Sequence, residues 1–459
     1  MRKHQAFITE PARQVPLTED RDVIVAGGGV SGVMAAIAAA REGADVLVLE
    51  RGASLGGVAA MGLPLQGFVG SNNDQIVLGL AEELRQRLIQ CGGAVDHFTP
   101  CDMHNPFQIV DPERVKLVTQ QMLKEAGASV RFHSFVSDAL MDGHKIDAIF
   151  TEGKSGREAC RAKLYVDCTG DADLAARAGA PYEIADAQLL QANTLNFTLS
   201  NVDTEAIKKY LKKDGTLYSL FPMLNERQLL ASDHFIMVGM QDLVERSKAE
   251  FPDADLWGNV CYITLVTPGT VCINSVHVHG YCPCESKDLS EIERIGRERA
   301  HQVYAFYKKY VPGFENAVLS STAPWAGIRE TRIIRGMSTL TLDAVRRGNI
   351  PSDSIALGGY PVDVHKPDTN GLIFYKVPAY GIPYGCLIPK DVDNLLVSGR
   401  AISADREAMA SSRVMAQCMA VGEASGIAAA LCARQGVSPA SLDVQQLRDA
   451  LTSHNARIR

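Results

Sequence analysis

Short apolar runs separated by glycine turns dominate the first fifty residues of the chain. Residues 23–26 form a β-branched run that predicts a buried parallel strand, and glycines follow it directly. A helix is expected from Ser31 to about Arg41, and the run 45–49 predicts a second strand ending at Glu50. This strand, turn, helix and strand predict the Rossmann type of α/β unit.

The glycines of this turn have a spacing that points to a nucleotide. Gly27, Gly29 and Gly32 follow G-x-G-x-x-G: the first permits a tight turn, the second admits a phosphate, and the third lets helix and strand pack closely. The helix N-terminus that follows suits a pyrophosphate. Glu50, followed by Arg51, stands close to the offset at which a carboxylate reaches a ribose hydroxyl. A dinucleotide site is therefore predicted.

Two later segments repeat the strand, glycine turn and helix. Residues 164–166 predict a strand, and the turn at Thr169-Gly170 allows contact with a phosphate-bearing cofactor, while Asp171 or Asp173 is expected to cap the next helix. Near the C-terminus, the expected elements are a strand at 393–398, a turn at Gly399-Arg400, a loop at 401–412 and a helix from Arg413. The cofactor is thus expected to contact both ends of the chain.

The pattern between these units predicts an insertion. Helices are expected at 74–90 and 111–126, and a β hairpin within 129–149 turns at Asp142-Gly143. From about 185 to 325, strands such as 195–199 and 262–266 mix with polar helices such as 290–310. The fold class expected is α/β, with a discontinuous Rossmann-type nucleotide-binding domain (1–185 and 326–459) and an inserted α+β substrate or cap domain (186–325).

Composition and charge limit the classes of partner and cofactor that the chain is expected to bind. The chain has 459 residues, 46% of them hydrophobic, and a formal net charge of −7 without a basic stripe, which disfavours nucleic acid. Its 11 cysteines include no C-x-x-C pair, so reduced thiols in the cytoplasm are expected and an iron–sulfur cluster is not.

Two segments bear on localisation. Residues 1–20 lack the apolar core of a secretory signal and are expected to form a flexible arm. Residues 414–433 reach transmembrane length but contain Gln417, Glu423 and two glycines, which favours a buried helix. No membrane segment is expected.

Seven blocks in order resemble the FAD-dependent oxidoreductases of the glutathione-reductase-like superfamily, in the group distantly related to fumarate reductase flavoproteins. The blocks are GGGVSG with Glu50-Arg51, LGG at 55–57, and the segments 166–180, 327–336, 361–368, 380–403 and 411–426.

The resemblance implies a set of FAD contacts. The pyrophosphate is expected at the Gly27 turn, the adenosine ribose at Glu50 and the adenine near Val136. No histidine directly precedes Gly56, so the FAD is expected to be non-covalent. A helix N-terminus near the flavin would stabilise its negative charge after reduction. The cofactor residues expected are Gly27, Gly29, Val30, Ser31, Gly32, Glu50, Arg51, Gly56, Gly57, Val136, Thr169, Gly170, Asp171, Gly399, Arg400, Arg413, Val414 and Met415.

Four groups are candidates for chemistry on the substrate. Arg329 is suited to clamp a carboxylate or stabilise an enolate, although an ion pair with Glu330 is the alternative. His365 is a candidate acid or base, against simple hydrogen bonding to Asp363. Tyr380, with Tyr384, lines either the flavin pocket or the core. His277 and His279 alternate on one strand face, but no third ligand for a metal is identified, so no metal is expected.

The function expected is hydride transfer between FAD and a small organic substrate. Alternatives are a flavin monooxygenase or halogenase, recognised by oxygen-dependent NAD(P)H consumption, and a flavoprotein of RNA modification, recognised by retention on RNA. The partners expected are the small-molecule substrate and an electron donor or acceptor whose identity stays open. A homo-oligomer is compatible with the sequence, and neither nucleic acid nor membrane is expected as a partner.

Overall fold

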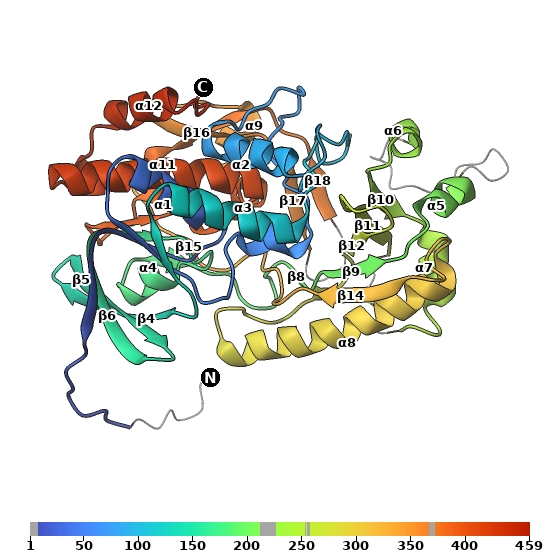
Figure 1. Ribbon diagram of the computed structural model, residues 1–459, viewed down its shortest axis with the longest axis horizontal. Helices are drawn as coiled ribbons and strands as arrows, with labels where there is room; N and C mark the ends of the chain where they lie inside the picture. The colour runs from blue at the N-terminus through green and yellow to red at the C-terminus, as the bar shows by residue number, and fades with distance from the viewer. Residues whose placement is uncertain (1–7, 212–225, 253, 255–257, 367–371) are drawn as a thin grey trace.

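The structure is a computed structural model that describes residues 8–211, 226–252, 254, 258–366 and 372–459. Residues 1–7 of the expected N-terminal arm and residues 367–368 of the block 361–368 lie outside this part of the chain. Two sheets organise the fold (Figure 1).

The main sheet combines strands from both ends of the chain. Its order is β3-β2-β1-β6-β5-β4, and β20 pairs with the later half of β6. Strands β1, β2, β3, β6 and β20 run parallel, whereas β4 and β5 form an antiparallel hairpin with β6. The strands are β1 (Leu17–Ala26), β2 (Val46–Leu49), β3 (Ser129–Arg131), β4 (Phe135–Asp142), β5 (Lys145–Gly153), β6 (Gly156–Asp167) and β20 (Leu395–Val397).

The parallel strands end at the same edge of the sheet. Ala26 pairs with Leu49 on one side and with Asp167 on the other, and Asp167 also pairs with Val397. Ligands of open α/β sheets bind outside such carboxyl ends, where the strand order reverses. The turns that leave these strands therefore form the floor of the site.

Alternate residues of the strands enter two separate cores. Val23 and Val25 face the helices α1 (Val30–Arg41) and α11 (Met415–Gln435), whereas Ile24 and Ala26 face α4 (Asp173–Arg177) and the β4–β5 hairpin. In Figure 1, α1, α11 and the helices α2 (Gly79–Gln90), α3 (Pro112–Glu125) and α12 (Val444–Ser453) lie on one side of this sheet.

Helices α1 and α11 pack backbone against backbone. A Cβ atom at Gly422 would lie 2.3 Å from Ser31 O, and one at Gly426 would lie 2.1 Å from Ala35 O. The spacing of four residues places both glycines on one helix face. Among the described residues, α11 is the one helix long and apolar enough to cross a membrane by length and composition, and 94% of its apolar window is buried within the protein.

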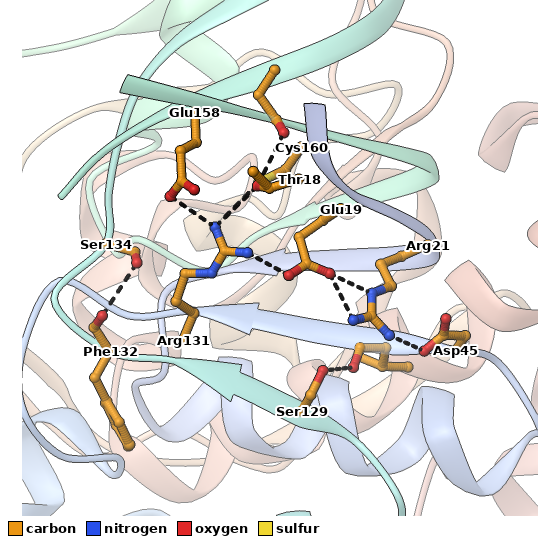
Figure 2. Close-up of polar contacts among 12 residues, drawn as sticks. Thr18, Glu19, Arg21, Asp45, Ser129, Arg131, Phe132, Ser134, Glu158 and Cys160 are labelled. Atoms are coloured by element: carbon orange, nitrogen blue, oxygen red, sulfur yellow. Dashed lines mark hydrogen bonds and ion pairs between the residues drawn. The ribbon is translucent and has the colours of Figure 1, made fainter. Parts of the chain in front are cut away.

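Strand β1 begins at Leu17, inside the segment expected to be a flexible arm, so that expectation is wrong for residues 17–20. An ion network holds this extension on the sheet (Figure 2): Glu19 accepts from Arg21 at 2.6 Å and pairs with Arg131, which also lies 3.4 Å from Glu158. Burial raises the pKa of Glu19, but the hydrogen bonds and charges of Arg21 and Arg131 outweigh burial and hold the pKa below its usual range.

The second sheet is antiparallel, with the order β10-β11-β12-β9-β14. Its strands are β9 (Phe197–Ser200), β10 (Ile236–Gly239), β11 (Val260–Thr264), β12 (Val271–Ile273) and β14 (Val318–Thr322). The helices around it are α5 (Thr204–Leu211), α6 (Glu226–Ala231), α7 (Gln241–Ser247) and α8 (Ser286–Tyr310). This sheet lies at the opposite end of the molecule from β4 and β5 (Figure 1). The expected fold class, a Rossmann-type sheet with an inserted α+β part, is confirmed; the domain boundaries stay a prediction.

Four short strand pairs lie outside these two sheets. They are β7 (Tyr182–Glu183) with β15 (Ile333–Ile334), β8 (Asn193–Thr194) with β13 (His277–Val278), β16 (Ser354–Gly358) with β19 (Tyr380–Pro383), and β17 (Val362–His365) with β18 (Leu372–Tyr375). The remaining α-helices are α9 (Leu342–Arg347) and α10 (Arg406–Ser412).

Three local expectations are corrected. Helix α2 begins at Gly79, not at residue 74, because Gly79 has φ of 62°. The expected loop 401–412 contains α10, whose N-cap Asp405 accepts from Ala408 N at 2.8 Å. The expected helix from Arg413 begins at Met415.

Helix α4 is also capped by other residues than expected. Asp167 and Thr169 each accept a hydrogen bond of 2.9 Å from its backbone N–H groups. Asp171 and Asp173 pair with arginines instead, so their side chains are committed elsewhere.

Candidate functional site

A cavity of about 370 Å³ lies at the carboxyl edge of the main sheet and extends to the second sheet. Its walls include the Gly27 turn and Ser398 of the main sheet and Ile236 and Ile263 of the second sheet. Segments from both ends and the middle of the chain therefore meet at one site.

The glycine turn has the geometry that its spacing predicts. Gly27 has φ of 99°, and a Cβ atom there would lie 2.5 Å from Cys168 O. A Cβ atom at Gly32 would lie 1.9 Å from Gly27 O, so this glycine allows α1 to pack against the turn. At Gly29 a Cβ atom would meet nothing within 4 Å, and no side chain of the described residues caps α1. An open glycine beside an uncapped helix N-terminus fits a pyrophosphate.

Glu50 supports this turn from below. Its Oε2 accepts from Gly28 N at 2.6 Å and its Oε1 accepts from Gly52 N at 2.6 Å, and the side chain is buried. Glu50 also lines the cavity. The carboxylate thus fixes the backbone on either side of the nucleotide pocket and presents an acceptor to it.

A second uncapped helix N-terminus faces the cavity from the far end of the chain. Val414 is the N-cap of α11 without a side-chain cap among the described residues, and Val414 and Met415 both line the cavity. Beside them, Gly399 has φ of 83°, and Arg400 donates to Gly170 O at 2.9 Å and pairs with Asp171. These bonds tie the two turns that follow β6 and β20 together.

Nearly all the expected cofactor residues line this one cavity. Those on its wall are Gly27, Gly29, Val30, Ser31, Glu50, Arg51, Gly57, Val136, Thr169, Gly170, Asp171, Gly399, Arg400, Arg413, Val414 and Met415. Gly32 and Gly56 lie behind it: Gly56 has φ of 97° and donates its N–H to Gly28 O at 2.9 Å. Direct contact of each residue with the cofactor stays a prediction, but the open glycine and the two helix N-termini fit FAD.

Arg329 lies on the cavity wall between the two sheets. Its Nη1 donates to Ala192 O at 2.7 Å and to Thr194 Oγ1. The alternative of an ion pair with Glu330 is wrong, because Glu330 pairs with Arg406 at 2.6 Å. Burial, followed by the charge of Arg413, lowers the pKa of Arg329 to about 10.

Arg413 ends α10 and points across the same wall. Its Nη1 donates to Arg329 O at 3.2 Å, and its Nη2 donates to Asp363 O at 3.0 Å and to Gln191 Oε1 at 3.2 Å. Burial lowers the pKa of Arg413, although the charge of Asp363 opposes this.

His365 and Asp363 share one face of β17 and both line the cavity. His365 Nε2 lies 3.4 Å from Asp363 Oδ1, and Gln191 Oε1 accepts from His365 N at 3.2 Å. Burial, followed by the charge of Arg329, lowers the pKa of His365 well below 6.5. The imidazole is therefore neutral at physiological pH and able to accept a proton.

Tyr380 does not line the cavity. It lies in the hydrophobic core, and its hydroxyl shares a hydrogen bond of 2.7 Å with Ser411 Oγ. Burial raises the pKa of this phenol. Of the two alternatives, the flavin pocket and the core, Tyr380 therefore occupies the core. Tyr384 is buried there as well.

The comparison with known families decides the class of protein. The profile of the family described as FAD dependent oxidoreductase matches residues 22–451. The chain belongs to this family. It is an FAD-dependent oxidoreductase, with FAD as the cofactor of the family.

Individual relatives match this flavoprotein over a shorter stretch. Digeranylgeranylglycerophospholipid reductase 2 of Methanopyrus kandleri is 31% identical over 159 residues, which is 32% of this chain and 37% of the relative. Digeranylgeranylglycerophospholipid reductase 1 of the same organism is 28% identical over 162 residues, 32% of this chain and 39% of the relative. The match thus spans less than half the length of either relative.

A solved structure gives a match over more of the chain. The geranylgeranyl bacteriochlorophyll reductase-like protein of Thermoplasma acidophilum is 13% identical to this flavoprotein, with a TM-score of 0.46. The alignment covers 96% of this chain and 84% of that one.

Several residues of the cavity wall were not predicted from the sequence. Tyr360 and His104 line the cavity, and Tyr360 Oη lies 2.8 Å from His104 Nδ1. Gln191 connects His365 with Arg413. Tyr360 precedes the alternating Asp363 and His365, which is a signal that could have been used, but His104 and Gln191 stand in segments without a motif.

His277 has the rings of two other histidines as neighbours. The His277 ring lies 5.2 Å from the His365 ring and 6.0 Å from the His279 ring, measured between centroids. Within the described ranges, no group of three histidine, cysteine, aspartate or glutamate side chains is arranged to hold a metal. The eleven cysteines, all of which are described, are free thiols.

Proposed function

We propose that this flavoprotein is a dehydrogenase or reductase that transfers a hydride between FAD and a carbon centre of a small organic molecule. The observation that carries the proposal is the single cavity described above. Its sheet edge has the features that suit a dinucleotide, and the same cavity continues to His365, Asp363 and Arg329. The groups proposed to hold the cofactor and the substrate thus line one cavity.

The bound FAD supplies the hydride chemistry, and the chain supplies the surroundings. His365 is positioned to take a proton from the substrate or return it, and the carboxylate of Asp363 stabilises the imidazolium that forms. The apolar wall from β10 and β11 displaces water from the reacting carbon. Arg329 provides positive charge for an anionic group or an enolate.

Anaerobic mixing of the FAD-loaded protein with a panel of acids, alcohols, amines and enones tests this proposal. The names of the archaeal relatives add prenyl-chain alkenes to the panel, tested with the chemically reduced protein. A substrate of the oxidative direction bleaches the 450 nm region, and an alkene or enone acceptor restores its colour. Inertness to every class, together with rapid oxygen-dependent NAD(P)H consumption, would instead support a monooxygenase or halogenase. A cytoplasmic location is part of the proposal and is tested by cell fractionation.

A further inference from the structure

Arg329 and Arg413 differ from three neighbouring arginines in the groups to which they bond. Their hydrogen bonds all go to uncharged groups: carbonyl, amide and hydroxyl oxygens. Three neighbouring arginines each pair with a carboxylate: Arg400 with Asp171, Arg332 with Asp173 and Arg406 with Glu330. Within the described residues, Arg329 and Arg413 thus have no carboxylate bonded to them.

Two buried guanidinium groups without a bonded carboxylate destabilise the folded protein unless an anion binds to them. A buried charge is usually paired with an opposite charge. Hydrogen bonds to neutral acceptors alone do not offset the free energy of removing the charge from water. Burial lowers the pKa of both arginines, to about 10 for Arg329, which therefore keeps its charge at neutral pH. A guanidinium group in a protein stays protonated, so Arg413 is also a cation. Their mutual repulsion adds to this cost.

The charge balance of this wall favours a monoanion. Asp363, which lies 3.4 Å from the neutral His365, is the acid whose charge acts on both arginines, while Glu330, which also acts on Arg413, is neutralised by Arg406. Two guanidinium groups and one carboxylate leave a single positive charge. His365 is neutral and adds no charge to this wall.

The surface beyond the arginines is apolar. Ile236 and Val238 of β10 and Ile263 of β11 line the cavity, together with Met103 and Leu372. The three strand residues are almost fully buried in the folded protein. A ligand that reaches from the arginines onto this wall therefore has one charged end and an apolar body.

We infer that Arg329 and Arg413 together bind the carboxylate of an organic acid whose apolar body packs on β10 and β11. Each guanidinium keeps N–H groups beyond those bonded to neutral oxygens, and such charged donors suit the oxygens of a carboxylate. This inference rests on the proposed function and names its substrate class: a carboxylic acid, oxidised or reduced at a carbon near its carboxylate, with His365 beside that carbon.

Binding of simple acids without turnover tests the inference. The FAD-loaded protein is titrated with butanoate, octanoate and 3-phenylpropanoate and with their amides, and binding is measured by calorimetry and by the change in flavin absorbance. The acid of at least one pair is expected to bind more than about tenfold more tightly than its amide. Arg329→Gln and Arg413→Gln should each weaken binding of that acid by about 10- to 100-fold and leave amide binding unchanged, with the FAD content of each variant measured alongside.

Arg335→Gln is the matched control, because Arg335 lies in the same segment as Arg329 but is exposed and pairs with Glu183. It should bind acids as the unaltered protein does. Lysine at either position should restore part of the acid affinity, since it keeps the charge but loses the paired donors.

The inference is overturned if every acid binds no better than its amide, or if octyl phosphate binds more tightly than octanoate. It is also overturned if the arginine variants lose FAD, because that result would assign these residues to the cofactor. Its failure is distinguishable from failure of the proposed function. A flavin that is bleached by a neutral substrate, in a protein indifferent to acids, leaves the oxidoreductase proposal standing. Arginine-dependent acid binding in a protein that no panel member reduces would support the site and contradict the proposed reaction.

Discussion

At the scale of single residues, the proton-transfer role of His365 gives a direct prediction. His365→Ala should keep its FAD, because the side chain lies on the substrate side of the cavity, but flavin reduction by the true substrate should slow by about 10²- to 10⁴-fold. Rapid-mixing absorbance under anaerobic conditions measures this rate. His301→Ala, on the exposed side of α8, is the control.

The pH dependence follows from the same burial. The neutral imidazole is the form that accepts a proton, and burial holds the pKa of His365 well below 6.5. Protonation therefore removes activity only at acidic pH, and this group should leave the reduction rate flat from pH 6.5 upward. A normal rate in the alanine variant, or loss of its FAD, would remove His365 from the mechanism.

At the scale of secondary-structure elements, Glu423 links α11 to the start of α2. Its Oε2 accepts from Leu80 N at 3.0 Å, at the helix end opened by Gly79. Burial raises the pKa of this carboxyl to about 8. The folded protein therefore holds a proton that the unfolded chain, with a pKa near 4.5, releases more readily.

This difference makes stability depend on pH in a defined direction. Because the folded pKa is the higher one, the group imposes no penalty below pH 4.5, and the protein loses stability as the pH rises from there to about 8, by about 1.4 kcal/mol for each pKa unit at most. Glu423→Gln keeps an acceptor for Leu80 N and should flatten this fall. Thermal unfolding at pH 5 and pH 8.5 measures it, with the exposed Glu298→Gln as control. Equal pH profiles for Glu423→Gln and the unaltered protein would contradict the assignment.

The same element shows what the sequence can and cannot predict. The unit β1–α1–β2 was predictable because its glycines, apolar runs and Glu50 are close in sequence and each follows from local geometry. Helix α10 was missed although Asp405 offered an N-cap signal. The cap that Glu423 gives to α2 joins residues 343 positions apart, and no local pattern encodes such a contact.

The residues of the site likewise divide into those that local sequence predicts and those that it does not. The nucleotide side was predictable from contiguous motifs. The substrate side gathers Gln191, His104 and Tyr360 from separate segments, and only tertiary packing places them beside His365. Tyr380 stands in a motif block, yet it points into the core because β19 pairs with β16 there.

At the scale of the whole molecule, FAD is expected to bind both ends of the chain at once. The Gly27 turn and the Gly399 and Val414 segments line the same cavity, although more than 370 residues separate the first from the second. A ligand bound only by the folded state stabilises it, by about 2.7 kcal/mol at a concentration 100 times its Kd. Removal of FAD should therefore lower the Tm and loosen all these segments together.

Hydrogen exchange on the FAD-loaded and FAD-free protein checks this expectation. Backbone amides near residues 27–32, 399–401 and 414–418 should gain protection in parallel when FAD is added, because both uncapped helix N-termini then acquire an acceptor. Amides of α12, which are distant from the cavity wall, should change little and serve as the internal control. Protection confined to the N-terminal turn, with 414–418 exchanging as in the FAD-free protein, would contradict a cofactor held from both ends. It would leave the N-terminus of α11 without the flavin that is expected there.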